Sequence, residues 1–263
     1  MSAKGYHTEI NSHIQMPRVL LKRFHNDNNR FFYYDVEKQI IGNNGTAKST
    51  NTEVGYYSKQ TEDYFRDNIE TPFGNLLTYI EKNNIYGDIF SISINAEQIV
   101  KNFICALVAR GPNFRQQMNS EKEFWQSFPL QFQHDYIAKA GLEIAIENDI
   151  FSDYIVTYMI NNTSTPFVLS MDGIYNYSLN GHQVINLPIL PFVTASLIHK
   201  DYSARVVRTD GSLSMFEISR PGDIMLMNDC AFSSQIKRNW GYVVCHEEDE
   251  LIRLKHKFVD SRS

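Results

Sequence analysis

Cysteine is scarce in this chain of 263 residues, which contains three and no CxxC spacing. Cys105, Cys230 and Cys245 therefore provide no paired-cysteine zinc framework. So sparse and odd a set of thiols fits a protein of the reducing cytosol. Cys105 lies in the apolar run 103–108, where we expect a small buried side chain rather than a reactive thiol.

Long apolar runs and familiar catalytic motifs are also missing. No stretch approaches the roughly 18 apolar residues that a membrane-spanning helix needs, and the N-terminus has no apolar signal core. These absences predict a cytoplasmic protein that does not enter a membrane. The chain has no Walker loop, GxGxxG, GxSxG or HExxH motif. It therefore supports neither a nucleotide-hydrolysing motor nor a serine hydrolase.

An excess of basic charge is lacking as well, because the formal net charge is −5. This balance argues against a protein coated in basic surface, although a local basic groove can still hold nucleic acid. The 43% hydrophobic and 21% charged fractions are those of an ordinary globular protein that can bury a core. The chain shows no internal repeat and no low-complexity linker.

The first predicted element pair is a β-hairpin. Residues 30–36 are aromatic and β-branched, Glu37 and Lys38 supply a polar turn, and 39–41 continue as the second strand. After a polar loop, the spacing of apolar residues becomes helical.

A layer of helices is predicted from residue 61 to about residue 150. Pro72 is expected to divide the stretch 61–81 into two helices. Residues 93–110 are apolar nearly all round, so we expect a central buried helix that a Gly-Pro pair ends. Two further amphipathic helices are predicted at 114–126 and 131–147.

Beyond residue 150 the segments become strand-like. We expect 154–160 and 166–170 to pair as antiparallel strands across an Asn- and Thr-rich turn. Pro188 and Pro191 should break the strands that follow. The remaining predicted elements are strands at 184–187 and 192–198, a helix at about 223–237 and a closing strand at 242–245.

These elements predict an α+β fold. A central helical bundle of about residues 61–150 would pack on the N-terminal hairpin and on a C-terminal antiparallel sheet. We interpret residues 1–263 as a single domain, with a helical layer at about 61–150 and a β-rich layer at about 151–250.

A motif near the N-terminus is the most informative feature. His13 and Pro17 precede a short, basic, amphipathic helix, and Leu21 and Phe24 follow the proline by four and seven residues. The pattern resembles the family catalogued as domain of unknown function 4238, over roughly residues 10 to 245. In that family the histidine lies three residues before the proline, whereas His13 lies four before it. The later segments that share the resemblance surround Glu70, Arg110, Asp172 and Asn228.

The N-terminal motif supplies the first candidate site residues. His13 would be fixed in an extended segment ahead of the helix, where its ring can titrate near neutral pH. The alternative is a hydrogen bond at the start of the helix. Arg18 and Lys22 recur at about one helical turn and could form a phosphate-binding edge, or simply a solvated face.

Glu70 and Arg110 are the next candidates. Glu70 matches the family's glutamate in its first long helix; if buried, it could act as a general acid or base, or pair with an arginine. Arg110 resembles the family's arginine-proline signature, with glycine in between. It ends an apolar helix, where a guanidinium needs carboxylate or phosphate partners. The favourable interaction of a cation with a helix C-terminus would also explain it.

The last candidates lie in the β-rich part. Ser170 and Asp172 match a family segment in which a strand ends at Ser or Thr and is followed by Asp, Asn and Pro, although Gly173 and Ile174 replace the last two. An aspartate just past a strand can reach into a pocket from a rigid support, or can close an Asx turn. Asn228 resembles an asparagine of the family's last helix, or is a polar helix face.

Two functions follow from these residues. In a phosphoester hydrolase acting on nucleic acid or nucleotides, His13 or Glu70 would move the proton and Arg110 would stabilise charge on phosphorus. Asp172 would orient the histidine or hold a metal, and Arg18, Lys22, Ser170 and Asn228 would contact the substrate. The resemblance implies an accessory role in bacteria and phages, such as phage defence or toxicity. The alternative is a non-catalytic module that binds a protein or a small ligand. The sequence identifies no cofactor and predicts no metal site.

Overall fold

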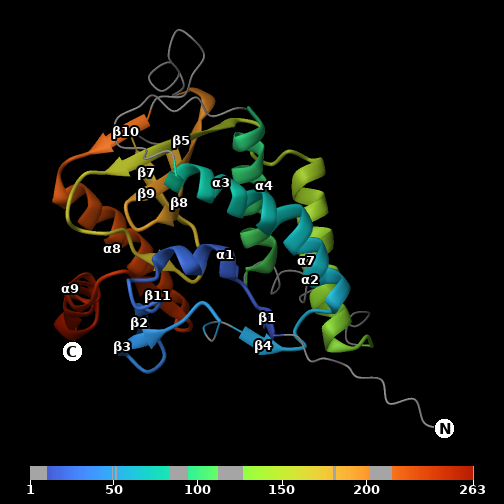
Figure 1. The fold of residues 1–263 in the computed structure, drawn as a ribbon, viewed down its shortest axis with the longest axis horizontal. Helices are drawn as coiled ribbons and strands as arrows, with labels where there is room; N and C mark the ends of the chain where they lie inside the picture. The colour runs from blue at the N-terminus through green and yellow to red at the C-terminus, as the bar shows by residue number, and fades with distance from the viewer. Residues whose placement is uncertain are drawn as a thin grey trace.

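A computed structural model describes residues 11–48, 50, 52–82, 94–111, 127–179, 182–201 and 215–262. These residues form an α+β fold, as predicted. Helices from the first half of the chain lie on one side of the molecule, and two sheets and the C-terminal helices lie on the other (Figure 1). That residues 1–263 form a single domain stays a prediction.

The N-terminal part contains the predicted hairpin. Its strands, β2 (Phe31–Asp35) and β3 (Ile40–Gly45), are antiparallel. Ahead of the hairpin, Pro17 precedes a short helix, α1, that continues as a 3-10 turn, η1. The other elements of this part are β1 (Asn11–His13), α1 (Arg18–Leu21), η1 (Lys22–Phe24) and β4 (Thr52–Val54), with β1 and β4 paired antiparallel.

The helical layer also follows the sequence. It comprises α2 (Lys59–Phe65), the π-helical segment η2 (Arg66–Glu70), α3 (Thr71–Lys82), α4 (Ile94–Arg110) and α7 (Leu130–Glu147). Pro72 is the second residue of α3 and does not end a helix, because helical backbone continues from α2 through η2 into α3; the interruption is the π segment just before it. Phe73 and Phe103 stack with ring centroids 3.7 Å apart and join α3 to the largely buried α4. The helix predicted at 114–126 lies outside the described residues.

A five-stranded sheet has the order β10-β5-β9-β8-β7. The expectation of a wholly antiparallel sheet was wrong at one edge, because β10 is parallel to β5. Strand β10 pairs with the second half of β5, from Tyr158 to Asn161, in the same direction. The strands are β5 (Tyr154–Asn161), β7 (Tyr175–Leu179), β8 (His182–Leu190), β9 (Val193–His199) and β10 (Met215–Ile218).

Pro188 does not break its strand as expected. Strand β8 continues through it to Leu190, and the pairing with β9 shifts register between these two residues. An irregularity at this point lets the sheet tolerate a residue that cannot donate a backbone hydrogen bond.

A four-stranded sheet joins the two ends of the chain. Its order is β3-β2-β11-β6, where β6 is Leu169–Ser170 and β11 is Tyr242–Cys245. The expected pairing of 154–160 with 166–170 is therefore wrong, because β6 pairs with β11. Asn161 closes a turn by donating to the carbonyl of Thr165 at 2.7 Å. The backbone N–H of Phe167 then donates to Pro191 at 2.7 Å, which directs the chain away from β5.

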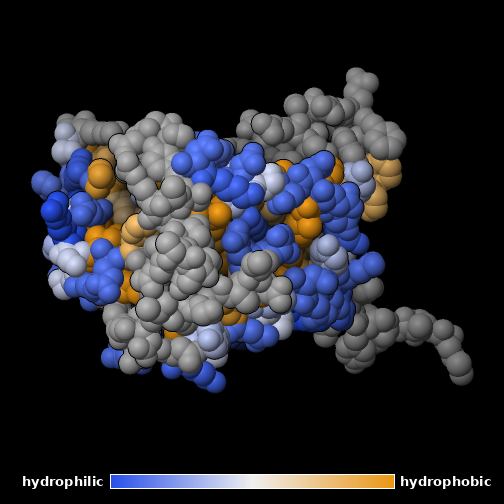
Figure 2. Space-filling model, turned by 90° about the horizontal axis from the view of Figure 1, so that it is seen from above, coloured by the Kyte–Doolittle hydropathy of each residue, from blue (hydrophilic) through white to orange (hydrophobic). Residues whose placement is uncertain are grey.

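Two C-terminal helices complete the fold. Helix α8 (Pro221–Arg238) includes the predicted helix 223–237 and contacts strands of the five-stranded and the four-stranded sheet. Helix α9 (Glu248–Phe258) was not predicted from the sequence and packs on α8. Phe232 of α8 contacts Tyr34 of β2, with ring centroids 5.0 Å apart. On the face shown in Figure 2, the coloured hydrophobic side chains appear in small areas between hydrophilic ones.

Candidate functional site

Asp172 lies in a tight turn between β6 and β7. The backbone N–H of Gly173 donates to the carbonyl of Ser170 at 2.9 Å, and Gly173 has a φ of 75°. The backbone N–H of Met171 donates to Oε1 of Gln235 on α8 at 2.9 Å. The turn is thus fixed by a strand on one side and a helix on the other, so the carboxyl group has a rigid support.

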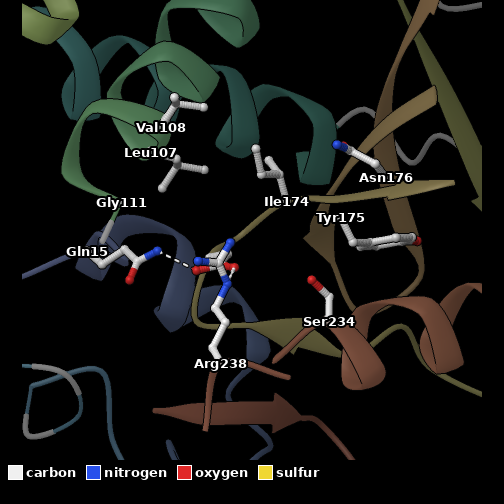
Figure 3. Close-up of a pocket in the computed structure, with 10 residues that line it drawn as sticks. Gln15, Leu107, Val108, Gly111, Ile174, Tyr175, Asn176, Ser234 and Arg238 are labelled. Atoms are coloured by element: carbon white, nitrogen blue, oxygen red, sulfur yellow. Dashed lines mark hydrogen bonds and ion pairs between the residues drawn. The ribbon is translucent and has the colours of Figure 1, made fainter. Parts of the chain in front are cut away.

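Two side chains contact the Asp172 carboxylate. Gln15 Nε2 donates to Oδ1 at 2.7 Å (Figure 3), and Nε of Arg238 forms an ion pair with Oδ2. Asp172 is 6% exposed. Burial raises the pKa of its carboxyl group, and the Arg238 guanidinium and the Gln15 amide partly offset that rise. Such a carboxyl group takes up a proton more readily than an exposed aspartate does.

A cavity of about 310 Å³ opens beside this ion pair. Gln15 and Arg238 lie at one end of the site, and Val108 and Asn176 lie toward the other (Figure 3). This volume is at the lower end of the range for small-molecule pockets. The wall comes from the segment before α1, from α4, from the β6–β7 turn and from α8, and is formed by Gln15, Leu107, Val108, Gly111, Asp172, Ile174, Tyr175, Asn176, Ser234 and Arg238.

Glu70 and Arg110 form a pair that does not line this cavity. Nη1 of Arg110 lies 3.0 Å from Oε1 of Glu70, so the structure has the pairing with an arginine that was one of the alternatives for Glu70. Arg110 is 1% exposed, and its guanidinium carbon lies 3.9 Å from the ring centroid of Phe65. Its Nε and Nη2 atoms have no hydrogen-bond partner. Arg110 does not line the cavity, although the next residue, Gly111, does.

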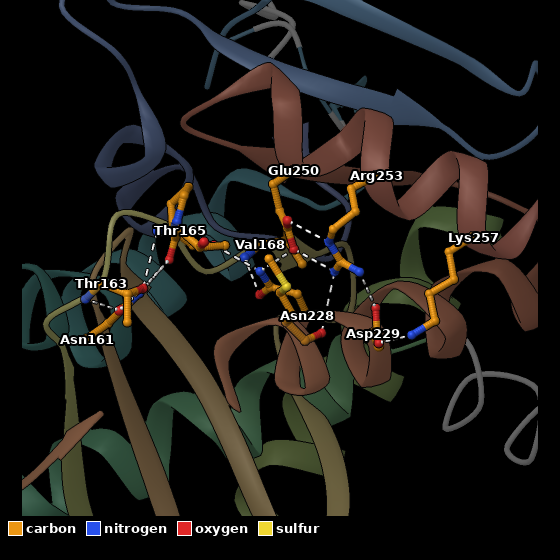
Figure 4. Close-up of polar contacts among 11 residues, drawn as sticks. Asn161, Thr163, Thr165, Val168, Asn228, Asp229, Glu250, Arg253 and Lys257 are labelled. Carbon is orange, nitrogen blue, oxygen red and sulfur yellow. Dashed lines mark hydrogen bonds and ion pairs between the residues drawn. The ribbon is translucent and has the colours of Figure 1, made fainter. Parts of the chain in front are cut away.

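Asn228 and Ser170 lie elsewhere in the interior. The Asn228 amide donates to the carbonyl of Pro166 at 2.9 Å and to Glu250 at 2.8 Å, and accepts from the backbone N–H of Val168 at 3.0 Å (Figure 4). These contacts tie α8 to α9 and to the segment that leads into β6. The Ser170 hydroxyl is buried without a hydrogen-bond partner and does not line the cavity.

The candidates of the N-terminal motif are not gathered at the cavity. Arg18 and Lys22 are exposed on α1 and η1, and neither lines it. The structure describes His13 through its backbone alone, in β1 opposite Thr52, and its side chain lies outside the described part. Of the predicted site residues whose side chains are described, Asp172 alone lines the cavity.

Gln15 and Arg238 are the site residues that sequence reasoning missed. A signal was present for Arg238, because Asn228, Gln235 and Arg238 are spaced by seven and three residues and so share one face of α8. Gln15 lies two residues before Pro17, inside the N-terminal motif, whose predicted site residue was His13.

Metal ligation and membrane insertion find no support in the described residues. Among them, no group of three or more His, Cys, Asp or Glu side chains is placed to hold a metal ion. None of the helices described here combines the length and the apolar character needed to span a membrane.

One family model matches the chain, over residues 15–178. No curated protein and no solved structure matches it. The matched segment includes Gln15, Glu70, Arg110 and Asp172, and ends before α8, which carries Asn228 and Arg238. Because the match covers more than half of the sequence, the chain belongs to the family described as protein of unknown function (DUF4238).

Proposed function

We propose that this protein is a binding module that holds a small molecule in the cavity between α4, the β6–β7 turn and α8. One observation carries the proposal: a cavity of ligand size has an ion pair, Asp172–Arg238, in its wall. Polar groups that converge on a partly apolar cavity are the usual features of a ligand site. Location in the cytoplasm is part of the proposal and is supported by the free thiols of Cys105, Cys230 and Cys245.

The separation of the predicted catalytic residues supports binding over catalysis. General acid–base chemistry requires the acting groups within hydrogen-bonding reach of one reacting centre. Glu70 and Arg110 pair with each other in the interior, whereas Asp172 pairs with Arg238 at the cavity. A buried pair such as Glu70–Arg110 can serve the fold alone.

The test is ligand capture by the purified protein. We expect small-molecule extracts from cells to raise its melting temperature, because a ligand that binds only the folded state stabilises it. Val108→Phe should abolish the rise, since Val108 lines the cavity from α4 and a larger side chain there would occupy space that the ligand needs. Ile252→Phe, on the exposed face of α9, is the matched control. Equal rises in both variants would contradict a ligand site in this cavity.

A second candidate function is hydrolysis of phosphoesters in nucleic acid or nucleotides, with a role in phage defence or toxicity. The observation that favours it is Asp172, a cavity-lining carboxyl whose pKa is raised by burial and which lies beside an arginine. A degradation assay with unbiased DNA, RNA and nucleotide substrates tests this function. His13→Ala, Arg110→Ala and Asp172→Ala should each lose turnover, and full activity in the folded variants would exclude the mechanism.

A further inference from the structure

We propose that the cavity ligand is a small anion, a carboxylate or phosphate monoester with a short apolar body, whose negative group binds Arg238. This inference rests on the proposed function and assigns the class of ligand. Three features of the cavity carry it: the distribution of its polar groups, the exposure of its two charges, and the occupancy of the Asp172 oxygens.

The cavity is amphipathic. Leu107, Val108 and Ile174 provide an apolar wall, and Gln15 and Arg238 lie together at one end of the site (Figure 3). A ligand that fills this space would place a hydrocarbon part along the apolar wall and a polar head at the Arg238 end. At about 310 Å³, the cavity suits a short chain or one small ring.

The two charges differ in their accessibility. The side chain of Arg238 is 25% exposed, whereas that of Asp172 is 7% exposed. An incoming ligand therefore meets the guanidinium more readily than the carboxylate. Guanidinium carries five donors in a planar fork that matches carboxylate and phosphate oxygens.

The Asp172 oxygens already have donors. Oδ1 accepts from Gln15 and Oδ2 is paired with Arg238. A cationic ligand would have to displace the arginine and would lie close to its positive charge. An anionic ligand instead competes with Asp172 for Arg238, so the electrostatics favour an anion.

This competition couples binding to a proton. The Arg238 charge and the Gln15 amide partly offset the rise in the Asp172 pKa that burial causes. When a ligand anion takes over the guanidinium, the Asp172 carboxylate loses part of that support and takes up one proton from solvent at a carboxylate oxygen. Binding should therefore tighten as pH falls, by up to about tenfold per pH unit where the proton is taken up.

Calorimetric titration with four probes that share a six-carbon chain tests the assignment: hexanoate, hexyl phosphate, hexylamine and 1-hexanol. We expect hexanoate or hexyl phosphate to bind, hexylamine not to bind, and 1-hexanol to bind at least about tenfold more weakly than the better anion. The two anions distinguish a carboxylate site from a phosphate site.

Variants of the ion pair should change anion affinity in opposite directions. Arg238→Gln should weaken binding at least about tenfold, whereas Asp172→Asn, which removes the competing charge, should tighten it about tenfold and abolish its pH dependence. Lys237→Gln removes the same charge from the neighbouring, exposed position on α8 and should change little. A purely structural pair would instead make both substitutions lower stability without a change of opposite sign in affinity.

The possible outcomes distinguish a wrong ligand class from a cavity that binds no ligand. Binding of hexylamine or 1-hexanol at least as tight as that of the anions, if abolished by Val108→Phe, would retain the ligand cavity and overturn the anion assignment. Stabilisation by cell extracts without binding of either anion would also retain the ligand cavity and overturn the anion assignment. No binding of any probe, together with no stabilisation by extracts, would overturn both. If Asp172→Asn fails to fold, the pH dependence of binding to the unmodified protein decides, because pH-independent affinity contradicts the competition.

Discussion

The turn that presents Asp172 depends on the backbone conformation of a single residue, Gly173. Its φ of 75° is rarely adopted by residues with a side chain. A Cβ atom there would lie 2.8 Å from Leu107 Cδ1 and 2.9 Å from Met16 Cε.

Gly173→Ala should therefore lower the free energy of unfolding by about 2 kcal/mol, from backbone strain and from contact with the two side chains. Urea unfolding measures this difference. Gly222→Ala is the control, because a Cβ atom there has no neighbour within 4 Å and the residue lies in the first turn of α8. That variant should be neutral or slightly stabilising, and equal losses in the two variants would contradict the conformational argument.

The buried Glu70–Arg110 pair gives a second prediction for single residues. Glu70→Gln leaves the guanidinium of Arg110 buried without its carboxylate, which should cost about 2–3 kcal/mol of stability. Arg110→Met removes the charge, keeps an apolar side chain against Phe65, and leaves Glu70 at 20% exposure, where water can reach it. It should therefore cost less than Glu70→Gln. Denaturant unfolding of both variants decides, and the reverse order would show that the arginine contributes more than its charge pairing.

The candidate site was only partly predictable from the sequence. Asp172 could be recognised because an aspartate just after a strand can reach a pocket from a rigid support, and Arg110 could be recognised because it ends an apolar helix and needs an anionic partner. The partners of Asp172 come from positions 157 residues before it and 66 residues after it. No local pattern indicates that Gln15 and Arg238 reach the same carboxylate, since only the packing of α8 and of the segment before α1 against the β6–β7 turn brings them together.

Helix α8 acts as an element that holds the chain segment 166–172 in place. Asn228 contacts the backbone of Pro166 and Val168, and Gln235 accepts from that of Met171. Arg238 then pairs with Asp172. Polar side chains on one face of α8 thus provide hydrogen-bond and ion-pair partners for a segment that forms only two residues of strand, β6.

Asn228→Ala tests this role of α8. It would leave the N–H of Val168, the carbonyl of Pro166 and the Glu250 carboxylate without their amide partner, at a cost of about 3 kcal/mol. Leu226→Ala, at a position 62% exposed on the same helix, should stay within about 0.5 kcal/mol of the unmodified protein. Thermal unfolding compares them, and a small loss for Asn228→Ala would mean that water replaces the amide.

Local elements were more predictable than their connections. The hairpin, α4, α7 and α8 follow from periodicity and from Gly and Pro positions. The insertion of β11 between β2 and β6 does not, because strand pairing over 200 residues leaves no periodic signal. The parallel pairing of β10 with β5 is likewise not predictable from periodicity, because it joins segments far apart in the chain.

At the scale of the whole molecule, β11 joins the N-terminal hairpin to the C-terminal helices, and its last residue, Cys245, is fully buried opposite Phe32. Burial raises the pKa of the Cys245 thiol from 9.0 to about 12. Cys105, buried in α4, also has its pKa raised to about 12. Both thiols keep their protons in the folded protein at pH values where the unfolded chain has lost them.

Alkaline pH should therefore destabilise the fold. Above pH 9 the unfolded state binds fewer protons than the folded state, so the free energy of unfolding falls as pH rises toward 12. Each buried thiol should contribute about 1.4 kcal/mol per pH unit in that range.

Urea unfolding under reducing conditions at pH 8, 9, 10 and 11 measures the slope. Cys245→Ala should make it shallower by about that amount, and Cys230→Ala should change it less because Cys230 is half-buried. An unchanged slope in Cys245→Ala would mean that the strand opens and exposes this thiol before the molecule unfolds.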